Sequence, residues 1–171
     1  HVDIQFKKNN WQNRNRINSK KGDAQWLTVP VMLKGHTGST IRDIKINEQD
    51  DWRRKYWGRI YDSYCKYPYF SLYAGELKDI LNKHHSHISE LNCDLIGFFR
   101  AVLGINNEVI FASDLSVRGN SSELLVSIVN AVGGTFYLSG PDGSQYMDLD
   151  LFSKNNIEVM FHQFTPPTYT S

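Results

Sequence analysis

The chain has 171 residues, 13% of them aromatic, and a formal net charge of +1 at pH 7. With a charge so close to zero, no global field favours nucleic acid or an anionic membrane as a partner, and no apolar run reaches the roughly 20 residues of a membrane-spanning helix. The two cysteines, Cys65 and Cys93, are too few for a disulfide framework or a zinc knuckle, and the expected location is cytoplasmic.

The first third of the chain is predicted to form short strands joined by polar turns. Its apolar and alternating segments predict strands over residues 3–6, 11–17, 25–31 and 41–46. The second and third of these form an N-terminal antiparallel hairpin. Residues 1–22 hold six Lys and Arg but one acidic residue, so basic charge gathers around this hairpin.

Two arginines of the hairpin are expected to share a face. If residues 11–17 are extended, Arg14 and Arg16 lie on one side, and Trp11, Asn13 and Asn15 lie on the other. Two guanidinium groups side by side suit an anion with several oxygens, such as a diphosphate, because each planar fork donates two charge-assisted hydrogen bonds. A solvated basic strand is an equally good interpretation of these residues alone.

The middle third is helical. Helices are predicted from residue 50, ending before Pro68, and over 72–82 and 86–103. The first carries Trp52, Tyr56, Ile60 and Tyr64 at every fourth position, a largely aromatic stripe that is typical of a core, with a sugar-stacking platform as the alternative. The histidines between the next two helices, at 84, 85 and 87, are expected to face solvent, and no metal site is predicted.

The last third alternates strands and helices. Strands are predicted over 108–112, 135–138 and 157–162, and helices over 121–132 and 145–154, the first helix starting with a capping box of Asn120 and Glu123. Strands joined through helices in this way pair in parallel. The fold class expected is α/β, with a mixed, partly parallel sheet, flanking helices and Rossmann-like layering. A single domain over 1–171 is expected, with a helical insertion or lobe at about 50–104.

Two loops offer small residues and backbone amides to an anion. The loop at 35–40 contains His36, and the loop after the strand at 135–138 contains Ser139, Gly140 and Asp142. In parallel sheets, ligands bind at the carboxyl ends of strands, although an ordinary connection has the same composition. Asp3, His36, Asp142 and His162 are candidate proton carriers by position only, and Asp3 is equally an ion-pair partner for the arginines. The Gly-rich dinucleotide motif and the nucleophile elbow are absent, so no cofactor is predicted.

Several strings in the chain resemble one protein family. The segment 5–17 (QFKKNNWQNRNRI), followed by 26–31 (WLTVPV), resembles the front half of the WbqC-like proteins of bacterial surface-polysaccharide gene clusters. The segment 137–140 (YLSG), Tyr146, Phe152 and the segment 167–169 (PTY) match the back half in order and spacing. Members of the family usually begin earlier and continue further, so the resemblance implies a chain trimmed at both ends.

The resemblance implies a role in O-antigen or capsule biosynthesis. With the arginines, it predicts an enzyme that acts on a nucleotide-activated amino sugar or another anionic small molecule, with acyl or aminoacyl transfer as the expected reaction. The catalytic candidates are Asp3, His36 and Asp142. The substrate-binding candidates are Gln5, Trp11, Asn13, Arg14, Asn15, Arg16, Trp26, Ser139, Gly140 and Tyr146. The alternative is a non-catalytic sugar- or protein-binding module of a biosynthetic complex.

Overall fold

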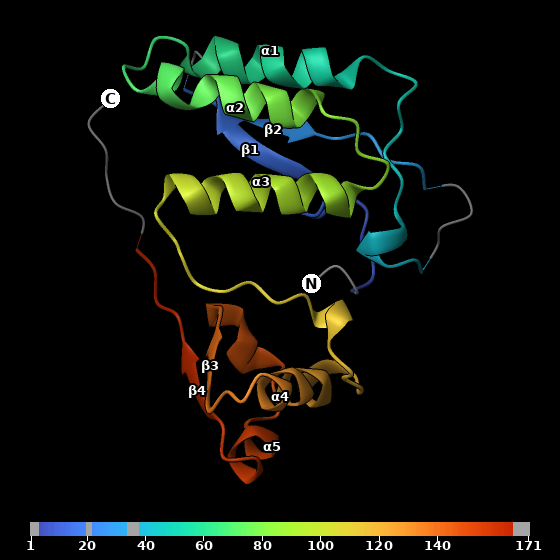
Figure 1. The fold of residues 1–171 in the computed structure, drawn as a ribbon, viewed down its shortest axis with the longest axis vertical. Helices are drawn as coiled ribbons and strands as arrows, with labels where there is room; N and C mark the ends of the chain where they lie inside the picture. Colours follow the sequence, from blue (N-terminus) through green and yellow to red (C-terminus); the bar gives the residue numbers. More distant parts are fainter. Residues whose placement is uncertain (1–3, 20–21, 34–37, 166–171) are drawn as a thin grey trace. The chain divides into compact units, whose positions relative to one another are not determined.

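The computed structural model describes residues 4–19, 22–33 and 38–165 (Figure 1). The chain divides into two compact units, His1–Val109 and Ile110–Ser171, and each is described by itself below. Within the described residues, five α-helices and two small sheets make a mixed α/β protein, as the sequence predicts. The expectation of a single domain stays a prediction.

The first unit begins with the expected antiparallel hairpin. Strands β1 (Arg14–Asn18) and β2 (Ala24–Thr28) pair so that Arg14 lies opposite Thr28 and Arg16 opposite Trp26. Alternation along β2 and the segment after it buries Leu27 and Val29. Pro30 lies beyond the strand, as expected of a residue that has no N–H for the ladder.

The described part of the first unit also contains three α-helices: α1 (Trp52–Tyr64), α2 (Phe70–Asn82) and α3 (Ile88–Val102). Pro68 separates the first two, as predicted. The aromatic stripe of α1 belongs to the core, since Trp52 and Ile60 are buried and Tyr56 packs against the buried cluster. The fully buried side chains of this core, each of which contributes about 1.5–3 kcal/mol by leaving water, are Ile44, Leu81, Ile88 and Leu91.

Two strand predictions in the first unit are wrong. Residues 41–43 form a short 3₁₀ helix (Ile41–Asp43), and the residues after it make only isolated bridges, between Val31 and Ile46 and between Lys45 and His87. The strand predicted at 3–6 is reduced, within the described residues, to one bridge between Gln5 and Thr40. Apolar alternation identifies the buried side chains here, but a strand also needs a continuous partner.

The second unit contains α4 (Ser121–Ala131), β3 (Phe136–Ser139), α5 (Leu149–Lys154) and β4 (Glu158–Phe161). Strands β3 and β4 pair in parallel, which confirms the predicted arrangement of 135–162. A small core fills this unit; its buried apolar members are Val126, Val129, Met147, Phe152 and Ile157.

Other predictions for the second unit are corrected. Residues 108–112 form no strand: Val109, Ile110 and Phe111 are exposed, and Ala112–Asp114 is a 3₁₀ turn. The capping box at Asn120 does not form, since no side-chain bond caps α4 there. The helix predicted at 145–154 begins only at Leu149, because Asp148 caps it by accepting a hydrogen bond from the Leu151 N–H at 3.1 Å. Rossmann-like layering is not confirmed, since each of the two described sheets has two strands.

Candidate ligand-binding site

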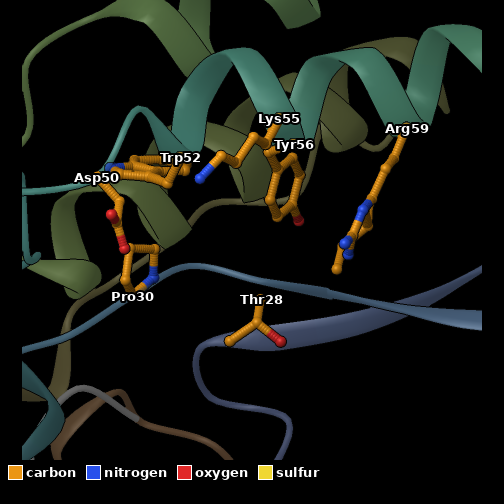
Figure 2. A pocket seen from close by; sticks show the side chains of 8 residues that line it. Thr28, Pro30, Asp50, Trp52, Lys55, Tyr56 and Arg59 are labelled. Atoms are coloured by element: carbon orange, nitrogen blue, oxygen red, sulfur yellow. The ribbon is translucent and has the colours of Figure 1, made fainter.

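Two neighbouring hollows share Thr28 and Pro30, at the end of β2. The first has a volume of about 270 Å³ and lies between β2 and α1 (Figure 2). The second has a volume of about 260 Å³ and lies between the hairpin and the residues that precede it. The side chains that line the first are Leu27, Thr28, Pro30, Asp50, Trp52, Lys55, Tyr56 and Arg59.

Helix α1 supplies the hydrogen-bond donors of the first hollow. Lys55 and Arg59 are four residues apart, and this spacing puts two cations on the same side of the helix. Figure 2 shows Tyr56 and Arg59 pointing from α1 toward Thr28 on β2. The Arg59 guanidinium also donates to the Trp26 carbonyl oxygen at 3.0 Å, which fixes its direction.

Tyr56 remains a hydrogen-bond donor at physiological pH. Burial raises the pKa of its phenol to about 12, because a phenolate is poorly solvated there. The ring also makes an edge-to-face contact with Trp52, at 6.0 Å between centroids, which holds the phenol in place. Asp50, whose carboxylate lies toward Pro30 in Figure 2, supplies an acidic group to the same hollow.

Arg14 and Arg16 share a face of β1, as predicted. Their guanidinium carbons lie 4.1 Å and 5.6 Å from the ring centroid of Trp26, the residue that pairs with Arg16 across the hairpin. Arg14 also donates to the carbonyl oxygen of Asn9 and lines the second hollow. One N–H group of the Arg14 guanidinium therefore holds the loop before β1. Arg14 has correspondingly fewer free donors for a ligand.

Trp11 lies on the opposite face from the one predicted. Its ring centroid is 5.0 Å from that of Trp26, which places Trp11 on the side of the arginines. The reason is that β1 begins only at Arg14, so strand alternation does not apply to Trp11. Trp11, Trp26, Arg14 and Arg16 consequently form one cluster of aromatic rings and cations.

The other polar candidates near the hairpin make backbone contacts. The Asn13 amide donates to the Val29 carbonyl oxygen at 2.8 Å, and Asn15 accepts from the Arg16 N–H at 2.8 Å. The Gln5 carbonyl oxygen accepts from the Gln12 side chain at 3.2 Å. These contacts give Gln5, Asn13 and Asn15 a part in shaping the hairpin and its loop.

The candidates in the second unit surround the end of β3. Ser139 is buried and donates through its hydroxyl to the Gly140 carbonyl oxygen at 3.1 Å, whereas Asp142 and Tyr146 are exposed. Asp142 belongs to a 3₁₀ turn (Pro141–Gln145). The structure leaves the binding role of this loop a prediction. The remaining catalytic candidates, Asp3 and His36, lie outside the described residues.

Gly143 is required by close approach to Ser139. A Cβ atom at position 143 would lie 2.0 Å from the Ser139 hydroxyl oxygen and 3.0 Å from the Met147 sulfur. We therefore expect Gly143→Ala to lower the free energy of unfolding by about 1–2 kcal/mol through overpacking. Urea unfolding measures this loss, and adding Ser139→Ala should restore most of it. Equal losses in the single and double variants would contradict the expected clash.

The histidine prediction holds for His84, which is exposed, and fails for His85, which is buried. His85 is only 2% exposed, and its Nε2 lies 2.9 Å from an Asp94 carboxylate oxygen, so it does not face solvent. His87 contacts Glu90, whose carboxylate also accepts from the backbone N–H groups of Ser86 and His87. Within the described ranges, no three His, Cys, Asp or Glu side chains gather to hold a metal ion.

Sequence reasoning missed the donors on α1. Lys55 and Arg59 flank the stripe that contains Tyr56, and the stripe alone predicts only a buried face. The basic pair four residues apart was the available signal. Its meaning depends on α1 lying against β2, which no local pattern reports.

The comparisons with known proteins agree with the strings described above. The model of the WbqC-like protein family matches residues 2–171. The chain belongs to the WbqC-like family. It is also similar to a protein of Mycobacterium tuberculosis (strain ATCC 25618 / H37Rv) described as "Uncharacterized protein Rv1507c", with 31% identity over 163 residues, which are 95% of this chain and 70% of that protein. No solved structure matches the chain. In this WbqC-like chain, none of the described helices is both long and apolar enough to cross a membrane.

Proposed function

We propose that this WbqC-like protein binds a nucleotide-activated amino sugar and modifies it during the biosynthesis of a bacterial surface polysaccharide. The observation that supports the proposal best is the gathering of Lys55, Tyr56 and Arg59 around Thr28, in a hollow that adjoins the one lined by Arg14. The two cations suit a diphosphate, because each balances negative charge and donates charge-assisted hydrogen bonds to phosphate oxygens. A hollow of this size suits part of such a ligand, and the adjoining hollow provides further room.

The modification that we propose is acyl or aminoacyl transfer to the amino group of the sugar. The amine nitrogen attacks the carbonyl carbon of an activated acyl donor, a C–N bond forms, and the bond to the donor's leaving group breaks. The amine proton must pass to a base, for which the Asp50 carboxylate is a candidate. The neutral phenol of Tyr56 is suited to donate to the negative oxygen that forms at the attacked carbonyl.

Binding measurements on single variants test the site. We expect Lys55→Ala and Arg59→Ala each to weaken the binding of UDP- or dTDP-linked amino sugars about tenfold or more, since a hydrogen bond to a charged group is worth about 1.5–3 kcal/mol. Isothermal titration calorimetry on the full chain measures the effect. Arg54→Ala is the matched control, because Arg54 is an exposed residue on α1 that pairs with Asp51 and does not line the hollow.

The outcomes separate the alternatives. Equal affinities for the wild type, Lys55→Ala and Arg54→Ala would place the ligand elsewhere and overturn the site. Mass spectrometry of mixtures with candidate acyl donors distinguishes an enzyme from a module: a product of increased mass supports transfer. Binding that depends on Lys55 and never gives a product supports a non-catalytic sugar-binding module.

A further inference from the structure

We infer that the indole ring of Trp11 is the platform on which the base of a nucleoside diphosphate stacks. The inference rests on the proposed function and assigns its ligand class, because a sugar phosphate without a nucleoside would leave the ring unused. Trp11 is 59% exposed, whereas Trp26, behind it, is 38% exposed. The two rings are 5.0 Å apart and tilted by 51°, so Trp11 rests on Trp26 and retains open surface.

The loop that carries Trp11 is held in place from several directions. The Gln12 side chain accepts from the Lys7 N–H at 2.7 Å and donates to the Gln5 carbonyl oxygen at 3.2 Å. From α3, the Asn92 side chain donates to the Gln12 carbonyl oxygen at 3.0 Å. Ordering a loop around an exposed indole costs conformational entropy and brings the core little burial. Such an arrangement is typical of a pre-organised binding surface.

The ring on which Trp11 rests belongs to the strand that lines the proposed phosphate site. Trp26 and Thr28 project from the same face of β2, two residues apart, which is about 7 Å along a strand. Thr28 lines both hollows, and the Arg59 guanidinium that enters the first hollow is bonded to the Trp26 carbonyl oxygen. One ribose can therefore join a base on the Trp11 surface to phosphates near Thr28.

The charges around the platform agree with this placement. The guanidinium groups of Arg14 and Arg16 lie beside Trp26, and Lys8 lines the second hollow with Arg14. These cations favour the phosphates, while the indole surface offers a partner to any base. Stacking on an aromatic ring is tolerant of base identity, so we expect UDP and dTDP to bind similarly.

Calorimetry with the full chain tests the platform, using UDP, dTDP and inorganic pyrophosphate as probes. We expect Trp11→Ala to weaken UDP and dTDP binding about fivefold or more and to leave pyrophosphate binding unchanged. Trp11→Tyr should retain most of the affinity, because it keeps an aromatic face. Tyr69→Ala is the control for removing an exposed aromatic ring, since Tyr69 is 71% exposed and lies outside both hollows.

Each outcome has one meaning. Unchanged nucleotide affinity in Trp11→Ala overturns the platform, and so does an equal loss of pyrophosphate affinity, which would show a general effect on the loop. If the wild type binds pyrophosphate as tightly as UDP, the platform fails while the proposed anion site stands. If the wild type binds none of the probes, the proposed function fails first and the platform with it.

Discussion

Replacing Phe152 with alanine is expected to remove about 3–5 kcal/mol from the free energy of unfolding of the second unit. Phe152 is fully buried, and its ring lies 5.4 Å from that of Tyr137 on β3. It is also the largest buried side chain of a core that has few buried apolar residues, so few neighbouring side chains can shift to fill the cavity. Amide hydrogen exchange over residues 121–161 measures the loss.

The same variant tests whether the two units unfold separately. All four tryptophans, at positions 11, 26, 52 and 57, belong to the first unit, so their fluorescence reports on that unit alone. With separate cores, the fluorescence transition in urea should stay where it is in the wild type. A parallel shift of the fluorescence transition would instead support one cooperative domain. Leu149→Ala, at an exposed position on the same helix, is the control and should have a small effect.

Asp94→Ala is expected to destabilise the first unit by about 1.5–3 kcal/mol, because it removes the partner of a buried imidazole. His85 Nε2 would lose its contact with the Asp94 carboxylate, and Nδ1 is already buried without a hydrogen-bond partner among the described residues. Lys83 also donates to this carboxylate, at 2.7 Å, but its side chain is largely exposed, so Lys83→Ala should cost little. Equal losses in the two variants would contradict the leading role of His85.

The Asp94 carboxylate also makes the stability of the folded state depend on pH, in a direction that follows from its pKa. Hydrogen bonds from Lys83 and His85 lower the pKa of Asp94 below its ordinary value of 3.8. The folded state therefore holds fewer protons at this site than the unfolded state, so its contribution is present above pH 3.8 and is lost as the pH falls through the lowered value. Urea unfolding at both pH 7 and pH 3 tests this sign. The difference in free energy of unfolding between the wild type and Asp94→Asn should be smaller at pH 3 than at pH 7. A difference that grows on acidification would contradict the assignment.

Features governed by neighbouring residues were predictable from the sequence. Pro68 separates α1 from α2, and the pair Gly133 and Gly134 ends α4, where Gly133 has a φ of +67° and the Gly134 N–H bonds to the Val129 carbonyl oxygen at 2.8 Å. That Arg14 and Arg16 share one face of β1 followed in the same way from the two-residue period of a strand. Each of these depends on backbone preferences within a few residues.

Features that depend on distant partners were not predictable. The apolar segment 108–112 has the composition of a strand, yet no described strand pairs with it. The burial of His85 depends on Asp94, which comes from the third helix, and the donors of the first hollow depend on where α1 meets β2. Trp11 lies on the face opposite to the predicted one because a turn, with Asn9 at a φ of +64°, comes before the strand. Local patterns contain no information about such contacts.

The hydrogen bond between Asn92 and Gln12 joins residues 80 positions apart. A contact of that sequence separation forms only after a long segment of chain has closed, which places it late in folding relative to the hairpin. The Trp11 loop therefore reaches its final order only when α3 is in position. Substitutions that loosen α3, none of whose residues line either hollow, should consequently weaken the nucleotide binding that we propose for this loop, by reducing the population of the ordered loop.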